Sequence, residues 1–591
     1  MSSRASQLDP FACSIQDNTT TRRNFLKQIR GAAAVTLAST AVTSASSAKA
    51  DPGPVSDVDR DDIERVLDSY ENRVQAARAE TKIPVPRQIT NGDERRYPNF
   101  IGNFSKGLPH NSLGEVDRNA YLSLLRALRE SRWDAFEKVT LGGDPGITGG
   151  QTPLVNPLAG LAFELEGTDS HQLAIPAFPS VASAKLADEA VELYWMALCR
   201  DVNFTRYKAD ELTVAATAEL SRLTEFSGPR SKDGHGPITA ETLFRGFTAG
   251  DLIGPYVSQL LLKPFNYGPY AVSGRMSMFL PKRDYLTDQI SWLACLNGRG
   301  PFAQPEIDPP SIATPRVIRT GRDLATYVHE DPKAGLFMSF YNAGIFLSAS
   351  GAQMNSGSPY SAVAPVAYQK QAAFGTFGLP FFLGLLGEAT TRAFKAAWYA
   401  KWFVHRALRP DQYGGLVHMT VTGQKKPAGY PLHNDILNSL ALAKVFTNYG
   451  AYLLPQAYPE AGPQHPSYPS GHATMAGACA TILKAAFADA PFTTLAAGKM
   501  TVDVASDDGL GLNPVNPDPE ITIYGEINKL ASNIAQGRNF AGIHWRSDAE
   551  WGMRLGEAVA LSALRDQNNN YVGENFEGFI ITKFDGTTVT V

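Results

Sequence analysis

Cysteine is scarce in this sequence, and neither charge is in marked excess. Only four of the 591 residues are cysteine, and one of them, Cys13, lies near the N-terminus. The remaining three, Cys199, Cys295 and Cys479, allow at most one disulfide and lack the spacing of a zinc site. Lysine and arginine number 54 against 58 aspartate and glutamate, so the net charge at pH 7 is −4. We therefore expect neither a disulfide-dependent scaffold nor a nucleic acid as partner.

Long hydrophobic runs and two common catalytic motifs are also missing. The most apolar internal stretch, residues 372–387, is too short for a membrane span and contains glycine and proline. We interpret this stretch as buried core. The sequence has no phosphate-binding glycine-rich loop and no Gly-x-Ser-x-Gly motif. These absences argue against a membrane-spanning enzyme, a P-loop nucleotide-binding protein and an α/β-hydrolase.

Residues 1–50 have the pattern of an export signal. Arg22-Arg23 is followed by a weakly apolar run of alanine, threonine and valine, which ends in Ala48-Lys49-Ala50. This order is typical of the twin-arginine route with an A-x-A cleavage site. We predict a periplasmic or extracellular protein with no membrane attachment after the signal is removed. The alternative is a disordered basic tail.

Helical periodicity dominates the rest of the chain. Apolar residues recur at three- and four-residue spacing in the segments 57–79, 118–139, 182–202, 208–226 and 390–408. A segment rich in proline, glycine and asparagine, residues 83–111, is expected to be loop. Strands do not alternate with helices, which argues against a parallel α/β sheet.

The C-terminus is the exception to this helical pattern. β-Branched residues flank Asp585-Gly586, which predicts a hairpin over residues 579–591. We predict a mainly α fold with a small C-terminal hairpin, the only hairpin for which the sequence gives a clear signal. The helical part divides into an N-terminal region, residues 51–390, and a second region, residues 391–591, which contains the candidate site.

The first block of candidate site residues lies in the sequence WYAKWFVHRALRP, residues 398–410. At about 100° per residue, Lys401, His405 and Arg409 fall on one face of a single helix. Trp398 lies one turn earlier on the same face. No carboxylate accompanies the cations, which favours an anion as their partner. The alternative is a solvated helix face.

The second block joins the turn HPSYP to an alanine-rich helix. Ser470, Gly471 and His472 stand at the start of that helix, where free backbone N–H groups and the helix dipole favour an anion. A histidine on this turn indicates more than a structural role. The alternative for Ser470 alone is an ordinary N-cap.

The third block contains Arg538 and His544, six residues apart, with Gly537 and Gly542 beside them. Asp548 follows His544 by four residues, so the two are neighbours if the segment is helical, and a carboxylate there orients the imidazole. The alternative is that Asp548 pairs with a neighbouring arginine or serves as a helix N-terminal charge. Together the three blocks supply the cations, N–H groups and histidines of a socket for a tetrahedral oxyanion.

The order of these blocks resembles the vanadium-dependent haloperoxidases. That family shares its anion pocket with type-2 phosphatidic acid phosphatases and bacterial class A acid phosphatases. The resemblance extends from Lys401 to Asp548. Gly537 replaces a serine of the broader pattern, and seven residues rather than six separate Lys401 from Arg409. Both departures are features of the bromoperoxidase branch, as is the chain length. The resemblance implies helical bundles of the vanadium haloperoxidase and acid phosphatase type.

The resemblance also implies roles for individual residues. His544 bonds the metal, His472 is the acid–base group, and Asp548 and Trp398 support the site. The groups that hold the vanadate oxygens are Lys401, Arg409, Ser470, the Gly471 N–H and Arg538. The carboxylate partner of His472 cannot be assigned from the sequence.

His465, seven residues before His472, is placed by the resemblance beside vanadate, where chloride-oxidising fungal members have a phenylalanine-type ring. A titratable imidazole there moderates the activation of peroxide, which predicts oxidation of bromide and iodide rather than chloride. Trp398 adds an apolar wall suited to a large halide. The alternative is that His465 only hydrogen-bonds its own loop.

The implied activity is vanadate-dependent oxidation of halide by hydrogen peroxide to hypohalous acid, which halogenates organic acceptors. The resemblance further implies a homo-oligomer and allows a structural calcium ion, for which the sequence assigns no ligands. One alternative is a phosphatase that uses His544 as nucleophile and His472 to protonate the leaving alcohol. Another is a non-catalytic scaffold that binds an oxyanion. In every case the fold should bring Lys401, His472 and His544 to one pocket.

Overall fold

The computed structural model describes residues 58–231, 236–300, 302–364, 367–424 and 430–591. The chain divides into two units, Met1–Val74 and Gln75–Val591. The predicted export signal, residues 1–50, lies outside the described residues. Helix α3 (Val58–Glu80) confirms the helix predicted over 57–79, and it begins in the first unit and ends in the second. All further features belong to the second unit.

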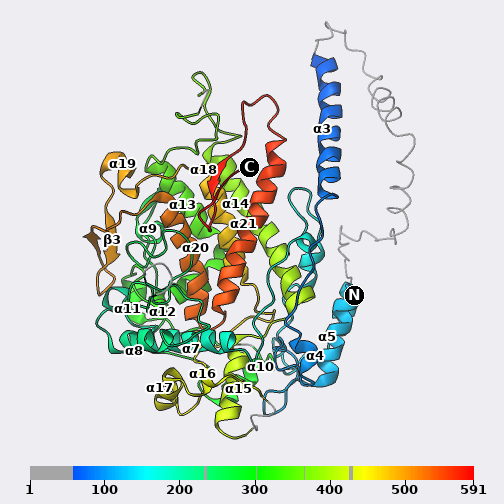
Figure 1. The fold of residues 1–591 in the computed structure, drawn as a ribbon, viewed down its shortest axis with the longest axis vertical. Coiled ribbons are helices and arrows are strands. Elements are labelled where there is room, and N and C mark those ends of the chain that lie inside the picture. The colour runs from blue at the N-terminus through cyan, green and yellow to red at the C-terminus, as the bar shows by residue number, and fades with distance from the viewer. Residues whose placement is uncertain (1–57, 232–235, 301, 365–366, 425–429) are drawn as a thin grey trace, which may run out of the picture. The chain divides into compact units, whose positions relative to one another are not determined.

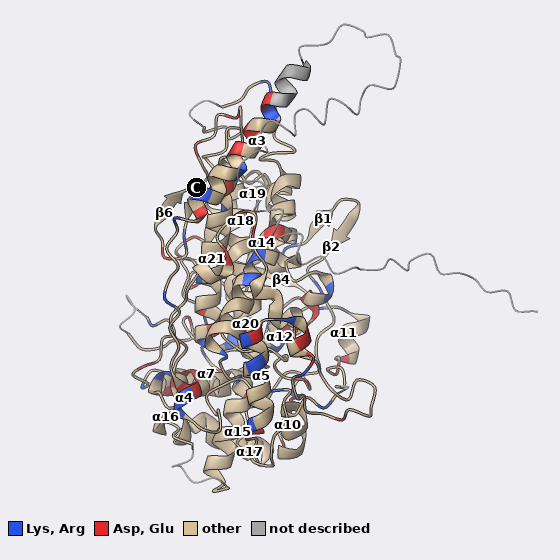
Figure 2. Ribbon diagram, turned by 90° about the vertical axis from the view of Figure 1, so that its right-hand side faces the viewer, with Lys and Arg blue, Asp and Glu red and all other residues tan. Residues whose placement is uncertain are grey.

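Four long helices form the centre of the second unit: α14 (Leu379–Tyr399), α18 (Gly471–Ala486), α20 (Ile523–Phe540) and α21 (Arg546–Asn568). Helix α18 packs against the other three, and Figure 1 shows this group in the middle of the unit. Its residues are almost all buried because alanine, glycine and threonine dominate its sequence and leave no wide polar face. Blue Lys and Arg segments and red Asp and Glu segments are interspersed along the described ribbon (Figure 2).

Glycines set the crossing between α18 and α21. A Cβ added to Gly477 of α18 would collide with the carbonyl oxygen of Met553, and one added to Gly556 of α21 would collide with that of Thr474. The two helix backbones are therefore in direct contact, which only glycine permits at these positions. This crossing places the first turns of α18 and α21 side by side.

Shorter helices surround this centre and carry loops toward the site. The α-helices are α4 (Asp93–Arg96), α5 (Arg118–Glu130), α6 (Trp133–Phe136), α7 (Ala184–Cys199), α8 (Glu211–Leu220), α9 (Gln259–Leu262), α10 (Gln289–Leu296), α11 (Pro309–Ala313), α12 (Gly321–Glu330), α13 (Met338–Ala349), α15 (Pro410–Val421), α16 (Asn434–Leu437), α17 (Leu440–Tyr449) and α19 (Leu495–Gly498). The 3₁₀-helices are η1 (Pro157–Leu161), η2 (Ser170–Gln172), η3 (Phe204–Arg206), η4 (Asp331–Ala334) and η7 (Phe492–Thr494). Segment η5 (Ala400–His405) is a π-helix.

The predicted mainly α fold is confirmed. The segments predicted over 118–139, 182–202 and 208–226 contain α5 and α6, α7, and α8, whereas 390–408 covers the end of α14 and then η5. The loop predicted over 83–111 contains only the four-residue α4. No helix in the described part of the chain combines the length and the apolar character of a membrane span. Cys199, Cys295 and Cys479 are buried free thiols.

The terminal hairpin is present, but it is one of three among the described residues. Strands β5 (Ile580–Thr582) and β6 (Thr588–Thr590) pair antiparallel around the Asp585-Gly586 turn, with Ile580 opposite Thr590. The sequence pattern did not indicate the other two, in which β1 (Phe265–Tyr267) pairs with β2 (Tyr270–Val272) and β3 (Val502–Ala505) pairs with β4 (Leu512–Val515). These strands have three or four residues, too few for a recognisable alternating pattern.

Residues 372–387 are buried only in part. Phe377 and Phe382 lie in the core, whereas Phe374 is 74% exposed. The interpretation of the whole stretch as core is therefore wrong, because its first half is loop and only one face of α14 packs inward. The division of the helical part at residue 390 stays a prediction.

Candidate active site

The first block does not form one helix face as predicted. Helix α14 continues as the π-helical η5 only to His405, and Arg406 has a left-handed backbone with φ of 42°. Arg409 is the N-cap of the next helix, α15, and its extended ψ of 155° is the conformation that a following proline favours. Lys401 and Arg409 therefore meet because the chain turns back, and not because they share a helix.

His405 lies apart from the other predicted residues of this block. Its ring packs edge-on against Tyr468, with 4.8 Å between centroids, and neither ring nitrogen has a hydrogen-bond partner among the described residues. Burial lowers its pKa to about 3, so the ring is neutral. We assign His405 to the packing around the site.

Lys401 is fully buried, and its ammonium group is held by backbone carbonyls. Nζ donates to the carbonyl oxygens of Pro466 and Ser467, both at 2.7 Å. An ammonium group has three N–H donors, so one remains for a further acceptor. Burial, with the nearby charge of Arg409, lowers the pKa of Lys401 well below its ordinary value.

Arg409 joins the three sequence blocks. Its Nη1 donates to the carbonyl oxygen of Ile543 at 2.9 Å and lies 3.1 Å from Nε2 of His544. Its Nη2 lies 3.0 Å from Nδ1 of His465. Burial lowers the pKa of this guanidinium to about 9.

The start of α18 combines the predicted cap with open N–H groups. Ser470 is the N-cap, and its Oγ accepts from the Ala473 N–H at 3.4 Å. The N–H groups of Gly471 and His472 precede the first intrahelical bond and are directed outward from the helix end. A Cβ at Gly471 would stand 3.1 Å from the ring of Trp398, so the glycine lets this ring pack on the helix end.

His472 has a carboxylate partner that sequence reasoning missed. Its Nε2 lies 3.3 Å from Oδ1 of Asp331, a fully buried residue at the start of η4. No signal in the sequence points to this pair, because 141 positions separate the two residues. Burial, followed by the charge of Arg538, lowers the pKa of His472, and Asp331 opposes this shift.

Arg538 lies in the last turn of α20 and contacts no carboxylate in the described structure. Its Nη1 donates to the carbonyl oxygen of Val328 at 3.0 Å, and its guanidinium lies 5.7 Å from the ring centroid of Tyr458. Nε is buried without a partner among the described residues. Val328 belongs to α12, which ends just before Asp331, so the same segment supports Arg538 and His472.

His544 and Asp548 are in contact, though His544 lies before the helix and not on it. Nδ1 of His544 is 2.6 Å from Oδ2 of Asp548, the third residue of α21. The same oxygen accepts from the Trp545 N–H at 3.1 Å and from Ser467 Oγ. Asp548 therefore also serves as a helix N-terminal charge, which was one of the two alternatives for this residue. The other alternative, an ion pair with the neighbouring Arg546, is not formed, because Arg546 pairs with Glu192.

The contact with Asp548 fixes the tautomer of His544. The carboxylate holds the proton on Nδ1, which leaves the lone pair on Nε2. Burial and the charges of Arg409 and Lys401 lower the pKa of His544 well below its ordinary value. A neutral imidazole with an unprotonated Nε2 is the form that bonds a metal, and here that nitrogen faces Nη1 of Arg409.

His465 and Trp398 form one wall of the site. Their rings pack with centroids 4.7 Å apart and an interplanar angle of 36°, and Trp398 Nε1 donates to the carbonyl oxygen of Val155. Nδ1 of His465 lies 3.2 Å from its own neighbour's carbonyl, that of Pro466, so the loop contact proposed as the alternative is also present. His465 nevertheless faces Arg409, which the alternative does not require.

The charge of the site suits an oxyanion. Lys401, Arg409 and Arg538 are buried, and none of them forms an ion pair with a carboxylate in the part of the chain described. Buried cations without counter-ions are costly, and a bound anion removes that cost. The described residues also contain no group of three His, Cys, Asp or Glu side chains placed to hold a metal cation. The donor set therefore fits vanadate, in which the oxygens carry the charge.

Comparisons with known proteins agree with this geometry. A family model described as the VCPO second helical-bundle domain matches residues 381–573. The vanadium-dependent bromoperoxidase of Corallina officinalis is 33% identical over 89% of this chain and 98% of its own length. That of Ascophyllum nodosum is 34% identical over 89% of this chain and 94% of its own length. The chain belongs to the vanadium-dependent haloperoxidases, in the bromoperoxidase branch.

The fold of this haloperoxidase agrees with a solved structure. The second vanadate-dependent bromoperoxidase of Ascophyllum nodosum, described as homohexameric, superposes with a TM-score of 0.79 at 29% identity. The match covers 89% of this chain and 90% of the other. The resemblance inferred from three short blocks is thereby confirmed for the family, and it extends over nearly the whole haloperoxidase chain.

Proposed function

We propose that this haloperoxidase oxidises bromide and iodide with hydrogen peroxide, using vanadate, and releases hypohalous acid that halogenates organic acceptors. Its membership of the bromoperoxidase branch supports this activity. The observation that carries the proposal is the set of three buried cations without carboxylate partners among the described residues, beside the unprotonated Nε2 of His544. A general oxyanion site needs no metal-bonding imidazole.

The cations and the end of α18 hold the oxygens of vanadate. Lys401 offers its third N–H, Arg409 and Arg538 their guanidinium groups, and Ser470 and Gly471 their hydroxyl and N–H. His544 bonds the metal through Nε2. When bound, vanadate supplies a Lewis-acidic centre that activates hydrogen peroxide toward halide. The clustered cations stabilise the negative charge that develops on oxygen during the reaction, because they are fixed in place and dry.

His472 is the acid–base group. Its lowered pKa keeps the ring neutral near pH 7, so it can accept a proton from hydrogen peroxide. Asp331 orients the ring and stabilises the positive charge that the ring then acquires. The protonated ring later returns the proton to an oxygen that leaves as water or hydroxide.

His465 sets the halide preference together with Trp398. His465→Phe should raise activity with chloride, because it removes an imidazole that faces Arg409 and competes for its charge. Steady-state kinetics with chloride, bromide and iodide, for wild type and variant, provide the measurement. Bromide and iodide should be oxidised by the wild type and chloride weakly or not at all. Efficient chloride oxidation by the wild type would contradict this role.

A single assay separates the proposed activity from the two alternatives. Purified protein is tested for peroxide-dependent bromination of a phenol-type dye before and after orthovanadate is added. We expect bromination that depends on added vanadate, since vanadate completes the site. Release of phosphate from a phosphomonoester, inhibited by vanadate, would instead indicate the phosphatase. Neither reaction would indicate the non-catalytic scaffold.

Three further expectations belong to this proposal. The Arg22-Arg23 pattern supports export by the twin-arginine route to the periplasm or beyond. The homohexameric relative supports a homo-oligomer. A structural calcium ion stays a prediction without assigned ligands.

A further inference from the structure

The segment from Val328 to Asp331 supports two residues of the vanadate site. The carbonyl oxygen of Val328 accepts from Arg538 at 3.0 Å, and the carboxylate of Asp331 lies 3.3 Å from Nε2 of His472. His329 stands between these two supports in the sequence, in the last turn of α12. A change in the course of this short segment therefore displaces both supports together.

Both ring nitrogens of His329 meet carboxylates. Nδ1 lies 2.8 Å from Oε1 of Glu330, and Nε2 lies 2.8 Å from Oε1 of Glu460. An ionised carboxylate only accepts hydrogen bonds, so both nitrogens donate and the ring is an imidazolium. The ring is packed between two others, with its centroid 5.2 Å from that of Phe279 and 4.4 Å from that of Tyr458. Its orientation is thereby fixed on every side.

The two carboxylates are attached to different parts of the structure. Glu330 follows His329 directly, so their contact joins the segment only to itself. Glu460 belongs to another segment, and its backbone carbonyl accepts from Nζ of Lys106 at 2.7 Å. Lys106 is fully buried and also pairs with Asp411, in the first turn of α15. The contact with Glu460 therefore joins the end of α12 to an anchored part of the fold.

Tyr458 makes a second contact between the same two segments. Its hydroxyl donates to the carbonyl oxygen of Ala325, one turn before His329. This bond holds the body of α12, whereas Glu460 holds its end, where the helix passes into η4. Asp331 is the first residue of η4, so its position depends on the contact at the helix end.

We propose that His329 is a positioning residue, which acts through Glu460 to keep Asp331 against His472. The inference rests on the acid–base role proposed for His472. A displacement of about 1 Å at a supporting residue costs up to about 10²-fold in rate, because the reacting groups lose their alignment. The side chain of Glu460 is 31% exposed, so its ion pair contributes little to the stability of the fold. Loss of this pair should lower turnover and leave the melting temperature nearly unchanged.

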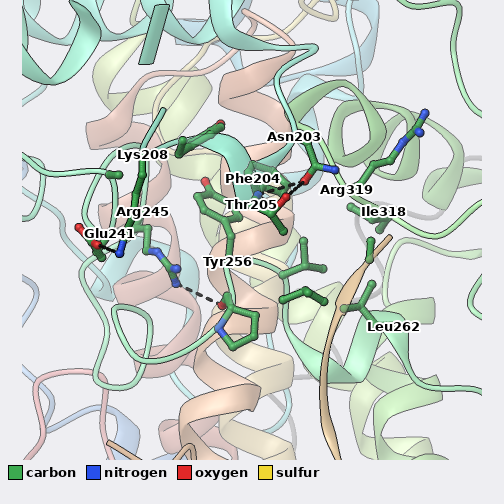
Figure 3. A pocket seen from close by; sticks show the side chains of 16 residues that line it. Asn203, Phe204, Thr205, Lys208, Glu241, Arg245, Tyr256, Leu262, Ile318 and Arg319 are labelled. Carbon is green, nitrogen blue, oxygen red and sulfur yellow. Dashed lines mark hydrogen bonds and ion pairs between the residues drawn. The ribbon is translucent and has the colours of Figure 1, made fainter. Parts of the chain in front are cut away.

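Glu460→Ala is the test variant, and Glu330→Ala is its matched control. Each deletes a carboxylate that lies 2.8 Å from the same ring, but only Glu460 belongs to another segment. Glu241→Ala is a remote control. It breaks an ion pair of 2.7 Å with Lys208 on the wall of a cavity of about 180 Å³, which none of the residues assigned to vanadate lines (Figure 3).

The full-length proteins are compared with orthovanadate in excess. The kcat and the KM for bromide, the vanadium content and the melting temperature are measured on the same samples. Hydrogen–deuterium exchange of peptides covering residues 324–336 is followed by mass spectrometry, which requires no catalytic activity. We expect Glu460→Ala to lower kcat about tenfold, with KM and vanadium content unchanged, and to speed exchange in these peptides. Its melting temperature should stay within about 2 °C of the wild type.

Both controls should match the wild type in kcat and in exchange. His329→Phe should lose the same factor in kcat as Glu460→Ala, and the double variant should lose no more, because both changes break one contact. An unchanged kcat or unchanged exchange in Glu460→Ala, or an equal effect of Glu330→Ala, would overturn the proposal. If the wild type itself did not oxidise bromide while Glu460→Ala alone exchanged faster, the contact would be supported and the proposed function would fail.

Discussion

His544→Ala is expected to leave the protein unable to bind vanadate. In the proposed site Nε2 of His544 bonds the metal, and without this bond only the electrostatic attraction of the cations is left, which does not select vanadate over other oxyanions. Bromide oxidation should fall to the background rate at the same time. The measurement is vanadium content by elemental analysis after gel filtration, with the halogenation rate recorded on the same samples.

His405→Ala is the control for this variant. It also truncates a buried histidine, but His405 contacts neither the cations nor Asp548, so vanadate should be retained at the wild-type ratio. Asp548→Asn should weaken vanadate binding by about 10–100-fold, because the amide no longer fixes the tautomer of His544. If His544→Ala retained as much vanadium per chain as the wild type, His544 would not be the metal ligand.

His472→Ala should keep bound vanadate and lose about 10²–10⁴-fold in turnover, the usual contribution of a positioned acid–base group. The kcat for bromide oxidation and the vanadium content must be measured on the same samples, since only a fall in kcat without a fall in vanadium content supports the acid–base role. Asp331→Asn should lie between this variant and the wild type, because it weakens the orientation of the ring without removing it. An equal loss of vanadate from His472→Ala and His544→Ala would contradict the assignment of metal bonding to His544 and acid–base catalysis to His472.

Local signals in the sequence located most of the site. The cap at Ser470, the anion-favouring helix end and the contact of His544 with Asp548 follow from residue types at short spacing, and the structure has all three. The single helix predicted over Lys401 and Arg409 is wrong because Pro410 opens a new helix, α15. The intervening π-helical turn has no recognised sequence pattern.

Features that depend on distant residues could not be predicted in this way. Asp331 meets His472 only because α12 packs against α20, and periodicity says nothing of such pairing. Short hairpins such as β1–β2 were not predicted for a different reason. Strands of three residues are too short to show a recognisable alternation of apolar and polar side chains.

The glycine contacts between α18 and α21 bear on how the enzyme loses activity when heated. Ser470 caps α18 and His472 lies in its first turn, while His544 precedes α21, which holds Asp548. The crossing at Gly477 and Gly556 therefore joins the two halves of the pocket. Opening the pocket means separating two backbones in direct contact at the centre of the core. Such a movement belongs to global unfolding rather than to local fraying. The slowest-exchanging amides of the protein should therefore surround its catalytic centre, and inactivation should coincide with melting.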